Sequence, residues 1–347
     1  MMEGEDPAAL GGGAVTLREF GERALIERVR RRLGPPSEDV LVGIGDDAAA
    51  VAWPGGTLLL TTDMLVEDVH FRRKTTTLRE LGAKALAVNL SDIAAMGGEP
   101  RFALVALALP AAASVGDVDD LYAGLTELAA RYGVALVGGD TCAAPERIVL
   151  TITLVGRVEG APVRRSGARP GDAILVTGTL GAAAAGLAAL ERGPLPVPDD
   201  VTAPLLTAHR SPTPRVAEGR LVQASGVATA MIDLSDGLAT DLGHIVEESG
   251  VGAEVRLSAL PVGEATRQLA RELGKEPWTW AVSGGEDYEL LVTARPEHAA
   301  TLATRVTAET GTTVTLIGEV RPVGEGLRFV DDAGRPVPVR AGFEHFR

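Results

Sequence analysis

The sequence predicts a two-domain α/β (α+β) protein, and three observations support this prediction. The chain has 347 residues, which corresponds to about two domains at the usual ~100–200 residues each. Short apolar runs typical of strands alternate in both halves with segments of helical apolar spacing. A polar segment rich in glycine and proline, residues 161–172, separates the halves. We therefore expect a disordered leader at 1–13, a first domain at 14–160 and a second at 161–347.

The first half contains both kinds of element. Its helical patterns have charges opposite an apolar face, and its strand patterns are short apolar runs. The run at 101–110 is continuously apolar, so we expect a buried strand that ends at Pro110. In order, the expected elements are helix 17–33, strands 39–45 and 57–63, helix 77–97, strand 101–110, helix 116–132, and strands 134–140 and 147–158.

The second half alternates in the same way. The segment GTLGAAAAG follows a strand pattern, and we interpret its glycines as a tight turn with close helix packing rather than a dinucleotide loop. A proline-rich loop at 193–214 is expected to lead to a helix. The other expected elements are a strand, turn and helix within 173–193, strand 227–233, helix 234–250, strand 253–260, helix 264–274, strand 288–294, helix 296–310 and strand 313–320.

Composition excludes several classes of protein. The net charge is −14, with 47 acidic and 33 basic residues, which argues against nucleic acid as a partner. No apolar run approaches the ~18 residues that a membrane-spanning helix needs. The one cysteine, Cys142, excludes an internal disulfide framework and is expected to be a small buried side chain in a reducing cytoplasm. No zinc-ligand spacing or Walker A loop is present.

Aspartates gather at the ends of predicted strands and helices, beside Gly, Ser or Thr. They are Asp46, Asp47, Asp63, Asp92, Asp140, Asp233 and Asp236. Each alone is typical of a turn or helix cap, but Asp92 lies in mid-helix and Asp233 ends an apolar run. Buried carboxylates need partners, and Mg²⁺ takes oxygen ligands while sharing its other positions with substrate phosphates. The pattern therefore predicts a metal-assisted phosphate site.

Two further segments fit such a site. The loop RRSGARPGD offers arginines, among them Arg165, that suit a phosphate group; a solvated linker is the alternative. The segment SGGEDYELL sets Glu286 and Asp287 between a glycine turn and an apolar strand. Neighbouring side chains on an extended chain diverge, so Asp46 and Asp47 are expected to do different work, with Asp46 in a supporting or turn-holding role.

Taken together, seven motifs resemble the thiamine-monophosphate kinase family, within the wider group of ATP-binding enzymes like aminoimidazole-ribonucleotide synthetase. They occur in the family's order and cover the chain from about residue 17 to 346. They are GIGDDAA, TTDMLVEDVHF, KALAVNLSDIAAMGGEP, VGGDT, RSGARPGD, IDLSDGLATDLGHI and SGGEDYELL.

The resemblance implies transfer of the ATP γ-phosphoryl group to thiamine monophosphate, giving thiamine diphosphate and ADP, with several Mg²⁺ ions and no catalytic side chain. It implies an N-terminal mixed-sheet domain that forms a homodimer, and a separate C-terminal α/β domain. The implied metal ligands are Asp47, Thr61, Thr62, Asp63, Asp92, Asp140, Asp233 and Asp236. The implied ATP contacts are Gly139, Asp140, Arg165, Ser235 and Tyr122, and the implied substrate contacts are His70, Glu286 and Phe343.

The chemistry agrees with this resemblance. The acceptor is a phosphate monoester whose second pKa is about 6, so direct in-line transfer needs no general base and no phosphoenzyme. Glu286 is expected to bind the thiazolium or the aminopyrimidine, and Phe343 to stack on a ring. Two alternatives stay open: an enzyme like aminoimidazole ribonucleotide synthetase, and a non-catalytic Mg-nucleotide-binding protein.

Overall fold

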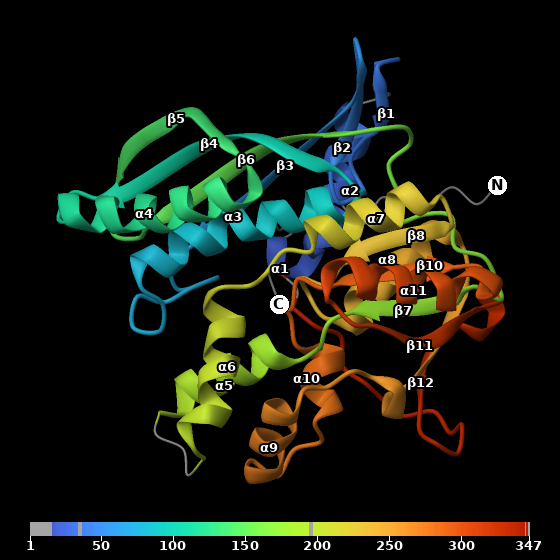
Figure 1. Cartoon of the computed structure of the whole chain (residues 1–347). Helices are drawn as coiled ribbons and strands as arrows, with labels where there is room; N and C mark the ends of the chain where they lie inside the picture. The colour runs from blue at the N-terminus through green and yellow to red at the C-terminus, as the bar shows by residue number, and fades with distance from the viewer. Residues whose placement is uncertain (1–15, 34–36, 194–196, 344, 346–347) are drawn as a thin grey trace.

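The protein contains two six-stranded mixed sheets, each packed against helices (Figure 1). The computed structural model describes residues 16–33, 37–193, 197–343 and 345. The expected leader at 1–13 lies outside these residues. The first sheet has the order β1-β2-β3-β6-β4-β5 and the second the order β12-β9-β11-β7-β10-β8. The predicted α/β fold with two sheet domains is therefore confirmed.

The first sheet is antiparallel except between β4 and β5, which run parallel. Helices α3 and α4 cover one of its faces (Figure 1). The elements of this half are α1 (Leu17–Phe20), α2 (Glu22–Leu33), β1 (Val40–Val42), β2 (Ala49–Trp53), β3 (Gly56–Val66), α3 (Leu78–Ala95), β4 (Glu99–Pro110), α4 (Val115–Tyr132), β5 (Ala135–Ala144) and β6 (Val149–Val158).

Helix α3 lies at the centre of the molecule. Thr77 begins it with a capping box, in which the Thr77 side chain and the Glu80 carboxylate each accept a backbone N–H of the other residue. Most of its side chains are buried, because the helix packs on the first sheet, on α4, and on α7 and β8 of the second half. At Gly82 a Cβ atom would lie 1.9 Å from the Leu121 carbonyl oxygen, so only glycine permits this close approach of α3 and α4.

The second sheet is antiparallel except between β9 and β12. Its helices lie on both sides of it and in a group below it in Figure 1. The elements are β7 (Ala173–Thr177), α5 (Ala182–Arg192), α6 (Asp199–Arg210), α7 (Val216–Ser225), β8 (Ala228–Asp233), α8 (Leu238–Ser249), β9 (Gly252–Arg256), the 3₁₀ turn η2 (Leu257–Ala259), α9 (Glu264–Glu272), α10 (Trp278–Ser283), β10 (Leu290–Ala294), α11 (Pro296–Thr310), β11 (Val314–Arg321), the 3₁₀ turn η3 (Val323–Glu325) and β12 (Leu327–Val330).

The interpretation of 193–214 as a loop is wrong, because α6 occupies Asp199–Arg210. Its prolines suggested a loop, but Val201, Leu205 and His209 recur every four residues and are buried as one stripe. The helix predicted at 234–250 also begins later, at Leu238, because the preceding glycine has φ 110° and ends an irregular turn. Strands β2 and β12 and helix α10 were not predicted.

Cys142 is exposed, which corrects the prediction of a buried side chain. It lies on β5, an edge strand that pairs only with β4, so most of the strand is uncovered in this chain. None of the helices in the described part of the chain is long and apolar enough to cross a bilayer.

Candidate active site

A cleft of about 750 Å³ lies between the two halves of the protein. β3 and α3 of the first half line one side. The turns after β8 and before β10, together with the C-terminal segment, line the other. Nine of the residues predicted for the site line this cleft: Thr62, Asp63, His70, Asp92, Asp233, Ser235, Asp236, Glu286 and Phe343.

Three carboxylates from separate elements meet beside the cleft, and two of them, Asp92 and Asp233, line it. Asp47 precedes β2, Asp92 lies on α3, and Asp233 is the last residue of β8. One oxygen atom of each lies within 4.8 Å of the others. Segments far apart in sequence therefore bring three of the seven predicted aspartates together in one acidic cluster.

Hydroxyl and amide groups fix the orientation of the cluster. The Thr61 hydroxyl donates a short hydrogen bond to Oδ2 of Asp92, and Ser91 Oγ donates to Oδ2 of Asp233 at 2.6 Å. Asn89 accepts the backbone N–H of Asp63 at 3.1 Å. The two hydroxyl groups thus orient the Asp92 and Asp233 carboxylates, and Asn89 holds the backbone at Asp63.

The cluster is electrostatically strained. Burial, with repulsion from neighbouring carboxylates, raises the pKa of Asp92 well above its ordinary value, and burial with repulsion from Asp47 raises that of Asp233 to about 8. Burial also raises the pKa of Asp63 and of Asp236, each to about 6. A nearby positive charge would favour the ionised form of all four groups.

The neighbouring acids Asp46 and Asp47 do different work. Arg165 donates to Oδ1 of Asp47 from Nη2 at 2.7 Å and from Nε at 3.2 Å. The Asp46 carboxylate instead accepts backbone N–H groups, those of Asp47 at 3.0 Å and of Arg165 at 3.3 Å. Asp46 therefore fastens the turn to the segment between the domains, while Asp47 faces the cluster.

The donor set fits a hard divalent cation. Oδ2 of Asp47 is buried and has no hydrogen-bond partner, and its carboxylate lies beside those of Asp92 and Asp233. Unpaired buried charges are costly, and carboxylate and hydroxyl oxygens are the ligands that Mg²⁺ prefers. Arg165 alone does not balance these acids.

The outer part of the cleft is aromatic. The Phe343 and His345 rings meet edge to face with centroids 4.8 Å apart, and His345 lies 5.1 Å from the His70 ring. Nδ1 of His70 accepts the Val66 backbone N–H at 3.0 Å, and burial lowers the His70 pKa. His70 therefore presents a neutral ring, suited to stacking.

The C-terminal segment is held against the turn after β8. Phe343 donates its backbone N–H to the Asp236 carbonyl at 3.1 Å, and Gly342 donates its own to Thr240 Oγ1 at 2.9 Å. A Cβ atom on Gly342 would lie 1.8 Å from the Asp236 carbonyl oxygen. The acidic side and the aromatic side of the cleft therefore share the turn that carries Asp236.

Of the five predicted ATP contacts, Ser235 lines the cleft, Arg165 contacts Asp47 beside it, and the other three lie farther away in the single chain. Tyr122 lies on α4 and packs against the first core. Gly139 and Asp140 lie on β5, and the register runs from Asp63 through Ile152 and Val105 to Gly139. Three strand spacings of about 4.8 Å each therefore separate β5 from Asp63.

The sequence reasoning missed two residues that contact Glu286. Lys84 Nζ lies 2.5 Å from Oε1 of Glu286, and Nδ1 of His209 lies 3.0 Å from Oε2. A lysine within the apolar run GAKALAV was the available signal for Lys84. The sequence contains no such signal for His209, because the segment around it is predicted to be a loop.

Asp287 is also structural rather than part of the cleft. Its Oδ2 accepts the Gly181 backbone N–H at 2.7 Å, at the N-terminus of α5. A carboxylate of the protein itself therefore occupies the helix end within GTLGAAAAG, in agreement with the interpretation as a tight turn rather than a phosphate loop.

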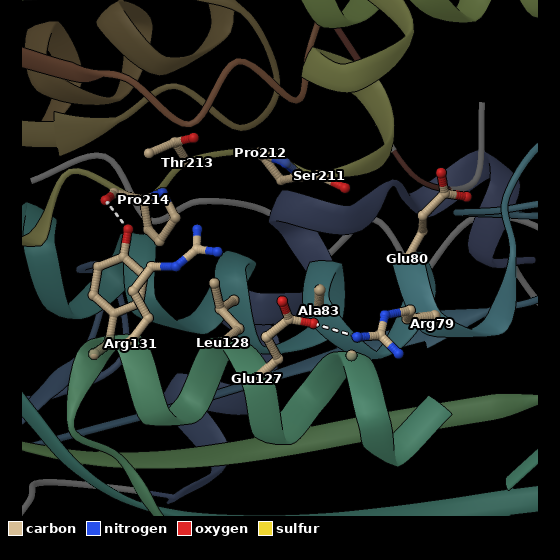
Figure 2. A pocket seen from close by; sticks show the side chains of 12 residues that line it. Arg79, Glu80, Ala83, Glu127, Leu128, Arg131, Ser211, Pro212, Thr213 and Pro214 are labelled. Atoms are coloured by element: carbon tan, nitrogen blue, oxygen red, sulfur yellow. Dashed lines mark hydrogen bonds and ion pairs between the residues drawn. The ribbon is translucent and has the colours of Figure 1, made fainter. Parts of the chain in front are cut away.

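A second cavity, of about 220 Å³, lies between α3, α4 and residues 211–214 (Figure 2). Arg79 on its wall pairs with Glu127 at 2.6 Å, and Tyr132 donates to the Pro214 carbonyl at 3.1 Å. None of the predicted site residues lines it. The acidic cleft is therefore the candidate active site.

The chain is similar to known proteins over most of its length. Two family models match the chain: "AIR synthase related protein, N-terminal domain" at residues 45–158 and "AIR synthase related protein, C-terminal domain" at residues 169–330. A curated relative, the thiamine-monophosphate kinase of Salmonella typhimurium, is 41% identical over 335 residues, which cover 94% of this chain and 98% of the relative.

Two solved structures illustrate the range of similarity. AaThiL complexed with AMPPCP and TMP is 35% identical, with a TM-score of 0.84 over 96% of this chain and 99% of that one. The hydrogenase maturation protein HypE in complex with ATP is 22% identical, with a TM-score of 0.67 over 93% of this chain and 97% of that one. The second similarity shows the fold alone.

Proposed function

This chain belongs to the thiamine-monophosphate kinase family, and from that premise we propose that it transfers the γ-phosphoryl group of ATP to thiamine monophosphate, giving thiamine diphosphate and ADP. The observation that carries the proposal is the meeting of Asp47, Asp92 and Asp233 in one acidic cluster, two members of which line the cleft between the domains. A protein of net charge −14 needs bound cations to hold two phosphate esters together.

We propose that these acids hold several Mg²⁺ ions, with Thr61, Thr62, Asp63, Asp140 and Asp236 as further ligands. When bound, the ions would supply positive charge that offsets the negative charge of the two phosphate groups and the charge that shifts during transfer. Ser91 and Thr61 keep two of the carboxylates oriented. Arg165 is proposed to contact the nucleotide from the segment between the domains, with Ser235, Gly139, Asp140 and Tyr122 as further ATP contacts.

The transfer itself is proposed to be direct and in line. The acceptor is largely ionised near neutral pH, because the second pKa of a phosphate monoester is about 6, so the chain has no proton to remove. His70, whose pKa is lowered, would remain neutral and line the pocket with Phe343. A stable phosphoprotein after incubation with labelled ATP alone would contradict this proposal.

We also propose that the protein is a homodimer paired through its first sheet. One face of this sheet packs on α3 and α4, and the other exposes large apolar side chains. Leu60, Met64, Phe102 and Leu104 are 37–55% exposed on β3 and β4, and β5 beside them is an uncovered edge. An apolar face of this kind suits a second copy of the chain, and Asp140 would then lie at or near the interface.

The deciding experiment measures ADP release with Mg²⁺ and ATP against a panel of acceptors. We expect release with thiamine monophosphate and none with thiamine. Release with another acceptor and not with thiamine monophosphate would favour the aminoimidazole-ribonucleotide-synthetase-like alternative. Nucleotide binding without ADP release with any acceptor would favour the non-catalytic alternative. The cytoplasmic location stays a prediction from the sequence.

A further inference from the structure

Lys84 is a buried cation that is neither a proposed metal ligand nor a proposed ATP contact. It lies on α3, two turns before Asp92, and its side chain is only 2% exposed. Burying an ammonium group is costly unless it is paired and hydrogen-bonded. Its Nζ meets this condition with two acceptors, Oε1 of Glu286 at 2.5 Å and the His209 carbonyl oxygen at 3.0 Å.

The partner of Lys84 is held rigidly at the wall of the cleft. Glu286 has a φ of 70°, a conformation that residues other than glycine rarely adopt. Its backbone N–H donates to the Ser235 carbonyl at 2.7 Å. Burial raises the pKa of Glu286, but the Lys84 ammonium and the contact with His209 outweigh burial and lower that pKa to about 2. The carboxylate is therefore ionised and fixed on three sides.

We propose that Lys84 is a positioning residue for the vitamin substrate: together with His209 it holds the Glu286 carboxylate so that its free lone pairs face the cleft and accept an N–H donor of the substrate's aminopyrimidine. This inference rests on the proposed function. Each carboxylate oxygen offers about two lone pairs. The Lys84 ammonium pairs with Oε1, and the His209 ring lies beside Oε2 without a hydrogen bond from its Nδ1. The side chain is 27% exposed, and Glu286 lines the cleft.

The charge of Lys84 also determines which group of the substrate Glu286 can recognise. An ammonium group 2.5 Å from the carboxylate cancels most of the field that Glu286 would exert on a distant cation such as the thiazolium ring. The carboxylate still accepts hydrogen bonds at short range. Glu286 therefore selects a hydrogen-bond donor rather than a positive charge, and an analogue with an oxo group in place of the amino group presents an acceptor to an acceptor.

The test is a double-mutant cycle on Lys84→Met and Glu286→Gln, with kcat and KM measured separately for both substrates. We expect Lys84→Met to raise the KM for thiamine monophosphate by about 10–100-fold, the worth of a hydrogen bond to a charged group, and to leave the KM for ATP within about twofold. The double variant should be no worse than Glu286→Gln, because Lys84 acts through Glu286.

Lys275→Met is the matched control. Lys275 is an exposed lysine beside the Trp280 ring, so its removal should change neither KM. The wild type should also use the monophosphate of the oxo analogue poorly. In Lys84→Met, the ratio of kcat/KM for thiamine monophosphate to kcat/KM for this analogue should fall by at least about tenfold.

Three results would overturn the inference: an unchanged KM for thiamine monophosphate in Lys84→Met, an equal rise in both KM values, or additive losses in the double variant. Should Lys84→Met not fold, the same cycle with His209→Gln decides between these outcomes. Failure of the proposed function looks different, since the wild type itself would then form no ADP with thiamine monophosphate.

Discussion

Ser91 on α3 donates its hydroxyl hydrogen to Oδ2 of Asp233, the last residue of β8, at 2.6 Å. A side chain of the first domain thus orients a carboxylate of the second. Both groups are buried, so the bond is shielded from solvent. The acidic cluster forms only when the two domains pack against each other in this arrangement. The geometry of the cluster therefore depends on the packing of the domains.

Replacing Ser91 by alanine should weaken the metal site more than the fold. The change removes a hydrogen bond to a charged acceptor, worth about 1.5–3 kcal/mol, and frees Asp233 to turn. We expect the Mg²⁺ concentration for half-maximal activity to rise by about tenfold or more, measured by titrating Mg²⁺ at saturating substrates. Ser114→Ala is the control: it removes the cap of α4 and should lower stability by about 1 kcal/mol with no change in Mg²⁺ dependence.

Mutations of the adjacent residues Asp46 and Asp47 should reduce activity to different extents. Asp47→Asn removes a charge from the cluster, and we expect activity to fall by at least about 100-fold, since each 1.36 kcal/mol is tenfold in rate. Asp46→Asn keeps an oxygen that can accept the backbone N–H groups of Asp47 and Arg165, so its loss should stay within about tenfold. Steady-state kinetics with saturating Mg²⁺ measure both, and equal losses would contradict the division of roles.

The stability that Glu286 contributes should depend on pH in a defined window. Its folded pKa, about 2, lies below the ordinary value of 4.5. Its ionisation therefore stabilises the fold fully above pH 4.5, and this contribution is lost as the pH falls from 4.5 toward 2. The difference in urea midpoint between the wild type and Glu286→Gln should be constant from pH 8 to 5 and shrink below pH 4.5.

Glu146→Gln, at an exposed position, provides the reference for this series. Its difference from the wild type should be near zero throughout. A gap for Glu286→Gln that widened on acidification would mean that Lys84 does not hold Glu286 ionised.

Gly342→Ala should weaken the binding of the vitamin substrate. Its Cβ atom would lie 1.8 Å from the Asp236 carbonyl oxygen, so the C-terminal segment must shift and carry Phe343 with it. We expect the KM for thiamine monophosphate to rise by about tenfold, as for the loss of one ring contact of 0.5–1.5 kcal/mol. Gly324→Ala has open space at its Cβ position and should leave both KM values unchanged.

Charge on the open face of the first sheet should prevent dimer formation. Phe102 is 45% exposed on β4, and Phe102→Glu would place a carboxylate in an apolar interface, at a cost of several kcal/mol. We expect sedimentation to show a monomer for this variant and a dimer for the wild type. Val115→Glu, at an exposed position on α4, should remain dimeric. A wild-type monomer at micromolar concentration would refute the proposed pairing.

Most of the acidic cluster was predictable from local sequence. Asp92 interrupts an apolar helix and Asp233 ends an apolar strand, so each carries a charge where burial is certain and a partner is needed. Asp46 and Asp47 do have different contacts, but they lie in a turn between β1 and β2, so the alternation of side chains on an extended chain does not explain the difference. The predictions for Asp92 and Asp233 depend only on neighbouring residues in the sequence, and both side chains take part in the cluster in the structure.

What could not be predicted depends on long-range contacts. Whether Gly139 and Asp140 reach the cleft depends on strand order, which the local pattern of β5 does not encode. The pairing of Lys84 with Glu286 joins residues about 200 positions apart. Helix α6 was missed because prolines outweighed a buried stripe of only three residues, although Pro204 lies within the helix.

Because the chain has few lysines, the chemical modification of Lys84 can be used to follow the opening of the cleft. The chain has three lysines, of which Lys74 and Lys275 are exposed and Lys84 is buried. An amine-acylating reagent should therefore modify two lysine side chains quickly in the native protein. Acylation of Lys84 requires the domains to part, so its rate, followed by peptide mass spectrometry, reports how often the cleft opens.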